Sequence, residues 1–190
     1  MTHVFPVSDG FVIGSCVKHI PLAGRDITKF TLNMLRDRKE PLPSDEALEI
    51  ARTVKEKYGY VCSDLVKEYK KFDKKEQAPD GQWYLNKKFK KYVHKTAAGT
   101  SIEIDVGYER FLGPEMFFHP EFLHQDWRTP LDEVIDDSIQ SCPMDYRRLL
   151  YKNIVLSGGS TLFDGFDKKL NDLVQKRVDT RLQAYEQVIG

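Results

Sequence analysis

Cysteine and net charge are both scarce in this sequence. Its 190 residues include three cysteines, Cys16, Cys62 and Cys142. They are too few and too widely spaced for a disulfide framework or a metal-binding motif, so we expect a reducing compartment. The 29 Lys and Arg residues balance the 29 Asp and Glu residues. This balance excludes attraction of the whole molecule to nucleic acid or to an anionic membrane.

Long apolar runs are missing as well. No stretch approaches the ~18 consecutive apolar residues that span a membrane, and the mean hydropathy is -0.50. Residues 1–6 lack the basic segment and apolar run of a signal peptide, so we expect no secretory leader and no membrane insertion. Aromatic residues make up 12% of the chain, too large a share for a disordered protein. The length predicts one domain or two small lobes.

The periodicity of apolar residues predicts a mixed chain of helices and strands. Apolar residues on both sides of residues 8–10 predict a β-hairpin, and alternation over residues 102–106 predicts a strand. Helical spacing predicts helices over residues 27–35, 44–58, 64–72 and 131–139. The stretch 111–122 contains Pro114 and Pro120, and we expect it to be a packed loop.

The last fifty residues hold the strongest local signal. Residues 153–156 are apolar and predict a strand, and the next five are Ser157-Gly158-Gly159-Ser160-Thr161. Apolar spacing from Phe163 to Val178 predicts a helix directly after them. Glycines in such a turn let a ligand approach the backbone, where N–H groups and hydroxyls favour phosphate. A Gly-Gly pair in such a turn is often only a tight connection, so the pattern alone is a weak signal for a ligand site.

Other polar residues give weaker signals. Lys55 and Glu56 lie side by side in a predicted helix and face different directions, which suits a solvent-exposed face or a ligand contact. The lysine-rich segment 87–95 follows a turn predicted at Pro79-Asp80-Gly81. It is interpreted as a solvated loop in preference to a phosphate-binding patch. The histidines show no zinc-ligand spacing.

Several segments together resemble the actin family. Residues 19–28 (HIPLAGRDIT) resemble the segment that opens the fourth subdomain of actins, and residues 54–58 (VKEKY) resemble the helix that contacts adenosine. Residues 151–161 (YKNIVLSGGST) resemble the adenosine loop of the family. Within the family, residues 105–122 and 142–148 are most similar to an actin-related subunit of the complex that nucleates branched actin filaments.

This resemblance implies a fold and a function. The fold would be α/β and actin-like, of the ribonuclease H-like ATPase type, present as a half with an incomplete mixed sheet. Residues 1–22 and 110–190 would form a core like the third actin subdomain, and residues 23–109 a mainly helical insertion like the fourth. The implied cofactor is ATP with Mg²⁺. The implied partners are other subunits of the nucleating complex, actin and nucleation-promoting factors, in the cytoplasmic actin cytoskeleton.

The resemblance also implies roles for individual residues. The glycine loop would line the adenosine and phosphate side of a cleft, with the last two residues near the base: Gly158, Gly159, Ser160, Thr161, Leu162 and Phe163. Lys55 and Glu56 would meet the adenosine, with Arg52 one turn earlier. Gly24 would lie at the cleft wall. His3 matches the histidine that helps to position attacking water in actin. No residue of the chain is implied as a metal ligand.

The chain also departs from the family pattern. It starts inside the family's second phosphate loop and lacks the N-terminal lobe, whose side chains hold metal and water. We therefore expect a partial chain that binds ATP without sustained hydrolysis of its own. The alternative is a truncated partner-binding module that binds no nucleotide. A sugar kinase of the same fold is disfavoured, because nothing suggests a catalytic aspartate beside a substrate pocket.

Overall fold

The computed structural model describes residues 1–72, 76–77, 83–84, 89–96, 99–124 and 126–189. Two sequence-based assignments lie outside these residues, namely the turn at Pro79-Asp80-Gly81 and the lysines at positions 87 and 88.

The chain divides into two compact units. The first contains Met1–Ala23, Met116–Leu162 and Phe166–Gly190, and the second contains Gly24–Glu115 and Phe163–Gly165. The sequence placed the corresponding boundaries at 22/23 and 109/110. It did not anticipate that a three-residue segment near the C-terminal helix would belong with the second unit.

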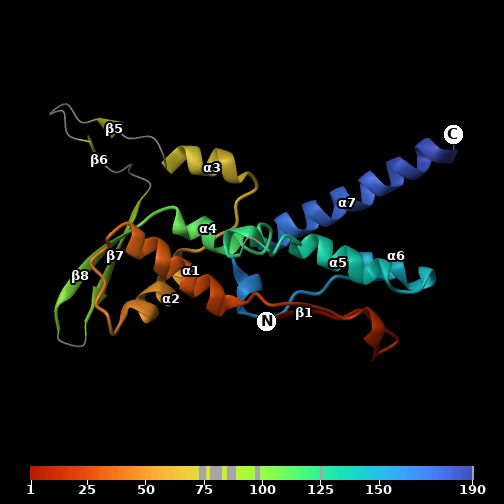
Figure 1. Cartoon of the computed structure of the whole chain (residues 1–190), viewed down its shortest axis with the longest axis horizontal. Helices are drawn as coiled ribbons and strands as arrows, with labels where there is room; N and C mark the ends of the chain where they lie inside the picture. The colour runs from red at the N-terminus through yellow and green to blue at the C-terminus, as the bar shows by residue number, and fades with distance from the viewer. Residues whose placement is uncertain (73–75, 78–82, 85–88, 97–98, 125, 190) are drawn as a thin grey trace. The chain divides into compact units, whose positions relative to one another are not determined.

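The first unit starts with two short antiparallel ribbons (Figure 1). Their strands are β1 (Thr2–Val4), β2 (Val7–Ser8), β3 (Phe11–Val12) and β4 (Lys18–Ile20). β1 pairs with β4 and brings His3 opposite His19. β2 pairs with β3, and Gly10 takes a φ of 82° in the turn between them, a conformation that glycine adopts without steric cost. The predicted hairpin is confirmed.

The helices of the first unit pack through aromatic rings and ion pairs. They are η1 (Gly14–Cys16), η2 (Pro120–Phe122), α5 (Leu131–Gln140), α6 (Met144–Lys152), η3 (Gly159–Leu162) and α7 (Phe166–Ile189). The Phe166 ring at the start of α7 lies 5.5 Å, centroid to centroid, from the rings of Phe117 and Phe118. Arg177 on α7 donates a hydrogen bond to Asp132 on α5. The helix predicted over residues 131–139 is confirmed as α5.

The second unit is built from helices and a long hairpin. Its elements are α1 (Gly24–Asp37), α2 (Ala47–Tyr58), α3 (Leu65–Phe72), β5 (Glu76–Gln77), β6 (Trp83–Tyr84), β7 (Lys90–Lys95), β8 (Ser101–Val106) and α4 (Glu109–Glu115). Apolar residues at helical spacing on α1 and α2, including Leu35 and Ile50, are fully buried. They share a core with Ile104 and Val106 of β8. The predicted strand and the three predicted helices of this unit are confirmed. The interpretation of segment 87–95 as a solvated loop was wrong for residues 90–95, which form β7 because β8 pairs with their backbone.

The sheets of the described chain are all small. Each has two antiparallel strands, and one isolated parallel bridge joins Tyr60 to Asp164. Mixed helix and strand content with small, incomplete sheets matches the expected α/β actin-like half.

The predicted packed loop over residues 111–122 was wrong in its first part, which forms α4. Pro114 has no N–H to donate to the carbonyl of Arg110, the bond that would continue the helix. The N–H of Tyr60 donates to that carbonyl instead, with an N···O distance of 3.0 Å. Phe111 and Pro114 are both buried. The hydrogen bond from Tyr60 and the burial of Phe111 and Pro114 therefore stabilise α4, although a proline disfavours a helix locally.

The strand predicted over residues 153–156 was also wrong. These residues are irregular, and Val155 is 87% exposed. An apolar extended segment becomes a strand only when a neighbour takes its backbone N–H and C=O groups. None of the described strands pairs with this segment.

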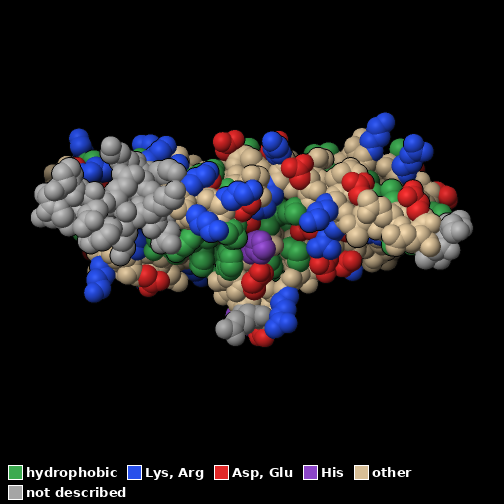
Figure 2. All heavy atoms as spheres, turned by 90° about the horizontal axis from the view of Figure 1, so that it is seen from above, with side chains coloured by type: hydrophobic (Ala, Val, Ile, Leu, Met, Phe, Trp, Pro, Cys, Tyr) green, Lys and Arg blue, Asp and Glu red, His purple; other side chains and the backbone are tan. Residues whose placement is uncertain are grey.

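The surface and the cysteines agree with the composition. Lys and Arg side chains are interspersed with Asp and Glu over the face shown in Figure 2, so charges of one sign do not gather there.

Cys16, Cys62 and Cys142 are buried thiols without a disulfide. Burial raises the pKa of the Cys142 thiol to about 11. Within the described residues, no helix combines the length and apolarity needed to cross a membrane.

A buried ion pair lies in the second unit. The Nη2 atom of Arg38 is 3.0 Å from Oε1 of Glu109, whose side chain is fully buried. Arg38 also lies over the rings of Phe89 and Tyr108, 5.2 and 5.3 Å from their centroids. Burial raises the pKa of Glu109 above its usual value, whereas Arg38 acts in the opposite direction. Arg38 therefore favours the charged carboxylate, together with the Gly107 N–H, which donates to the same oxygen at 2.8 Å.

We predict that Arg38→Met lowers the free energy of unfolding by about 3–5 kcal/mol at pH 7, because it leaves a buried carboxylate unpaired. A glutamate with a raised folded-state pKa binds more protons folded than unfolded. Its stability contribution is present at low pH and is lost as pH rises through the folded pKa. Losing Arg38 raises that pKa further, so the penalty should be smaller at pH 5 than at pH 7.

Urea denaturation of the parent and variant at both pH values measures this effect. The control is Arg52→Met, which breaks an exposed pair with Glu56 and should cost much less. An equal loss from the two variants, or a penalty for Arg38→Met that does not change with pH, would contradict the prediction.

Candidate functional site

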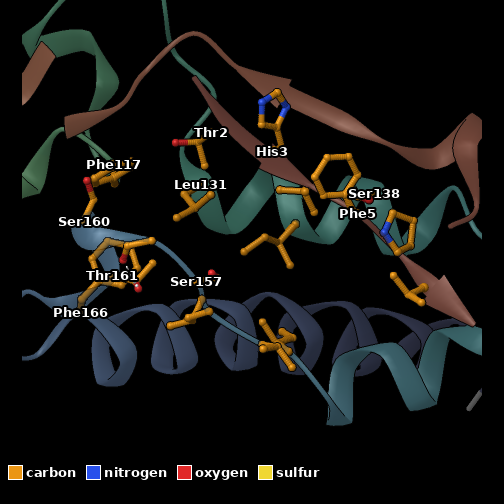
Figure 3. Close-up of a pocket in the computed structure, with 18 of the residues that line it drawn as sticks. Thr2, His3, Phe5, Phe117, Leu131, Ser138, Ser157, Ser160, Thr161 and Phe166 are labelled. Carbon is orange, nitrogen blue, oxygen red and sulfur yellow. Dashed lines mark hydrogen bonds between the residues drawn. The ribbon is translucent and has the colours of Figure 1, made fainter. Parts of the chain in front are cut away.

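A pocket of about 630 Å³ lies within the first unit. Three segments that are distant in sequence line it, namely residues 1–7, α5 and residues 153–161. Figure 3 shows Ser157 and Thr161 across the pocket from β1. The structure therefore brings His3, at the start of the chain, into the same pocket lining as the glycine loop.

The glycine loop (residues 157–161) is held by its own hydrogen bonds. The backbone N–H and the hydroxyl of Thr161 both donate to the carbonyl of Gly158, at 3.1 and 2.8 Å. Gly158 has a φ of 109°, which explains the need for glycine there. A Cβ added to Gly158 or Gly159 would meet no atom within 4 Å. Both backbones therefore face open space that a ligand can enter.

The helix expected directly after this loop begins later. The last three residues of the loop form η3 together with Leu162. Residues 163–165, ending at Gly165 with a φ of 79°, then separate η3 from α7, which starts at Phe166 and not at Phe163. The N–H groups at the start of α7 therefore do not follow the glycine pair directly. The open backbone of the loop itself is the feature available to a ligand.

The pocket combines hydroxyl groups with an apolar interior. Its apolar side chains include Phe117, Leu131, Ile135, Ile139 and Phe166. None of the described residues that line it is an Asp, Glu, Lys or Arg, and the titratable groups in the lining are the amino group of Met1 and the imidazole of His3. Such a lining suits the neutral parts of a ligand through apolar contact and hydrogen bonds to hydroxyls.

Like the hydroxyl of Thr161, two further lining hydroxyls already have acceptors. Thr2 donates to the carbonyl of Leu22 at 2.6 Å, and Ser138 donates to the carbonyl of Cys16 at 2.7 Å. These bonds tie β1 and α5 to the segment that follows β1. They leave the glycine loop as the polar wall that a ligand would address.

His3 contributes its backbone more than its ring to this pocket. The ring projects from β1 on the side away from Thr161 (Figure 3). Its Nδ1 atom lies 2.6 Å from Nδ1 of His19, and the ring stacks against Phe5 at a centroid distance of 5.5 Å. The sequence had suggested neither contact, because His19 had no spacing relation to His3.

The remaining predicted contacts form a separate group in the second unit. Lys55 donates from Nζ to the carbonyl of Gly24 at 3.2 Å. Its side chain is only 12% exposed, and burial lowers its pKa. Arg52 donates to Glu56 at 3.1 Å, and both side chains are exposed. Lys55 and Glu56, expected to face apart, approach each other at 3.9 Å between Nζ and Oε1.

Leu162 and Phe163, both predicted to lie near a base, have opposite surroundings. Leu162 is 83% exposed, whereas Phe163 is buried. A Cβ added to Gly59 would lie 2.7 Å from the Phe163 ring, so this ring packs tightly against a glycine of its own unit. The predicted base contacts of the two residues stay predictions.

Sequence reasoning missed the apolar side of the pocket. Leu131 and Ile135 look like ordinary core positions of an amphipathic helix, and Phe117 lies in a stretch that we expected to be a loop. No local pattern marks such residues as lining a cavity. Only the packing of α5 beside β1 and the glycine loop brings them together.

Comparison with known proteins settles the family. The family model for actin matches residues 1–188. The chain belongs to the actin family.

Among the described residues, no group of three or more His, Cys, Asp or Glu side chains could hold a metal ion.

Three relatives share the same description, actin-related protein 3. The chain is 50% identical to that of Drosophila melanogaster over 186 residues, which cover 98% of this chain and 43% of the relative. It is 51% identical over 190 residues to that of Dictyostelium discoideum, covering 100% and 44%. It is 53% identical over 189 residues to that of Acanthamoeba castellanii, covering 99% and 42%. The chain thus spans less than half the length of these relatives.

We predict that Phe163→Ala lowers the free energy of unfolding by about 3–5 kcal/mol, the usual cost of removing a buried phenylalanine ring. Leu162→Ala should have almost no effect, because that side chain is exposed. Thermal and urea denaturation of the two variants test this matched pair of neighbours. Equal stability losses would show that Phe163 does not anchor its unit.

Proposed function

We propose that this chain supplies an ATP-binding part of an actin-like subunit in a complex that nucleates branched actin filaments. Its proposed partners are the other subunits of that complex, actin and nucleation-promoting factors, in the cytoplasmic actin cytoskeleton. The family membership and the three actin-related protein 3 relatives support this assignment. The observation that carries the nucleotide site is the open glycine loop in a pocket that also contains His3.

The pocket residues fit the neutral groups of a nucleotide. Gly158 and Gly159 expose backbone that phosphate or ribose oxygens could approach. Ser160 and Thr161 add hydroxyls beside it. We propose that these four residues contact the nucleotide, as the family resemblance implies.

We propose that Lys55 and Glu56 in the second unit also contact adenosine, with Arg52 and Gly24 beside them, and that this contact does not depend on the glycine loop. Lys55 is held by its bond to the Gly24 carbonyl, which limits the orientations of its side chain. Glu56 is already oriented by Arg52. A side chain positioned before the ligand arrives loses less entropy on binding. Leu162 and Phe163 are kept as proposed neighbours of the base.

Mg²⁺ would be carried by the phosphates of ATP. Magnesium commonly keeps several waters and binds substrate phosphates with only one or two protein carboxylates. The described pocket lining contains no carboxylate, so its residues would bind the nucleotide and not the metal. We propose that the isolated chain binds ATP without sustained hydrolysis, since water and metal must both be positioned for phosphoryl transfer.

The second candidate is a partner-binding module that binds no nucleotide. The absence of Lys and Arg from the described pocket lining favours it, because the charge of a triphosphate would find neither an ammonium nor a guanidinium side chain there. Nucleotide affinity separates the two candidates.

We predict that Gly159→Val abolishes ATP binding by the 190-residue chain. The valine fits the unliganded structure, because an added Cβ meets no atom within 4 Å, and it fills the space that the ligand would enter. Gly158→Val is a poorer test, because its φ of 109° would strain any residue with a Cβ.

Gly14→Val is the matched control. Gly14 also begins a short 3₁₀-helix and has equally open surroundings, yet it is absent from the pocket lining. Calorimetric titration with Mg·ATP should show binding by the parent and Gly14→Val only, with no steady phosphate release. Equal binding by all three chains would exclude the loop as the site. No binding by any of them would favour the partner-binding module.

The role in nucleation is tested by a chimera. We predict that Drosophila actin-related protein 3, with its matched 186 residues replaced by this chain, assembles into a complex that nucleates branched filaments. The same chimera with Gly159→Val should assemble but nucleate at least tenfold more slowly. Filament branching observed by fluorescence microscopy measures both. A chimera that folds but fails to join the complex would contradict the assignment of partners.

A further inference from the structure

The two histidines of the β1–β4 ribbon form a close pair on its exposed face. His3 and His19 are directly opposite in the antiparallel register, and both side chains are exposed. Their Nδ1 atoms are 2.6 Å apart. At this distance at most one of the two atoms carries a proton, since two N–H groups would point at each other. At least one nitrogen lone pair is therefore directed into the gap.

The geometry of the pair is restrained from two sides. The strand pairing sets the separation of the two backbones. The Phe5 ring stacks on the His3 ring at 5.5 Å with an interplanar angle of 22°. The His3 and His19 rings meet edge to face, with centroids 4.8 Å apart and an angle of 88° between planes. Restrained ligands lose little rotational freedom when a cation binds.

We propose that His3 and His19 form a chelating site for a divalent transition metal of the copper type, bound through the two Nδ1 atoms. Imidazole is a preferred ligand of Cu²⁺, Ni²⁺ and Zn²⁺, and Cu²⁺ binds nitrogen sites more tightly than the other two. Water molecules would complete the coordination. The site is distinct from the proposed nucleotide contacts of the glycine loop and does not depend on them.

The distance between the nitrogens favours copper over zinc. With metal–nitrogen bonds of about 2.0 Å, ligands at the right angle of a square plane lie about 2.8 Å apart. Ligands at a tetrahedral angle lie about 3.3 Å apart. The observed 2.6 Å needs only a slight opening for the square plane and a larger one for the tetrahedron. We therefore expect tighter binding of Cu²⁺ than of Zn²⁺.

The test must separate this pair from another copper ligand set. A free amino group two residues before a histidine can bind Cu²⁺ together with that histidine, and Met1-Thr2-His3 would provide this arrangement. The chain is therefore produced with a short Gly/Ser extension before Met1. Titration with CuSO₄, followed by calorimetry and by electron paramagnetic resonance, then reports the imidazole pair alone.

We predict one Cu²⁺ per extended chain, with a resonance spectrum showing two nitrogen ligands. His3→Ala and His19→Ala should each weaken Cu²⁺ binding at least tenfold. His19→Phe keeps a ring at that position and should weaken it equally, which guards against a simple folding defect. His124→Ala, at an exposed histidine elsewhere in the first unit, should leave binding unchanged.

Three outcomes would overturn the proposal. The first is copper binding that is unaffected by His19→Ala and His19→Phe. The second is binding by the unextended chain only, which would assign the metal to the amino terminus and His3. The third is an affinity for Zn²⁺ equal to or greater than that for Cu²⁺, which would reject the square-planar geometry.

Discussion

Gly59 is the position on which the interior of the second unit depends. No Cβ can be accommodated there, because the Phe163 ring and the carbonyl one turn earlier in α2 occupy its space. The next two residues donate backbone hydrogen bonds to two different segments. Tyr60 donates its N–H to α4, and Val61 donates to the 163–165 segment. One residue without a side chain thus lets the end of α2 reach both of its neighbours, and the bond from Tyr60 allows α4 to contain a proline.

The lining of the pocket in the first unit determines which groups of a ligand it can bind. Its described lining has hydroxyls and open glycine backbone but no Asp, Glu, Lys or Arg side chain. Backbone dipoles contribute less to an anion than a paired lysine or arginine would. Most of the binding free energy available here must come from apolar contact and neutral hydrogen bonds. The pocket is therefore better suited to the neutral parts of a ligand than to anionic groups.

Much of the secondary structure could be predicted from sequence, because α1, α2, α5 and β8 bury the faces that their periodicity marks. The failures have physical causes. α4 depends on a hydrogen bond from Tyr60, and residues 153–156 pair with none of the strands that the structure describes. The glycine loop was found because glycine and hydroxyl residues are recognisable locally. The apolar wall formed by Phe117 and α5 was not, since buried apolar residues look alike whether they line a cavity or fill a core.

The chain crosses between its two units after Ala23, Glu115, Leu162 and Gly165. During synthesis, residues 24–115 leave the ribosome well before Phe163 is made. The second unit cannot complete its packing until Phe163, whose ring packs against Gly59, and Asp164, which pairs with Tyr60, have been made. Contacts between residues so distant in sequence form slowly. A nascent chain halted before residue 163 would expose an unfilled apolar surface and would be a natural client for a chaperone.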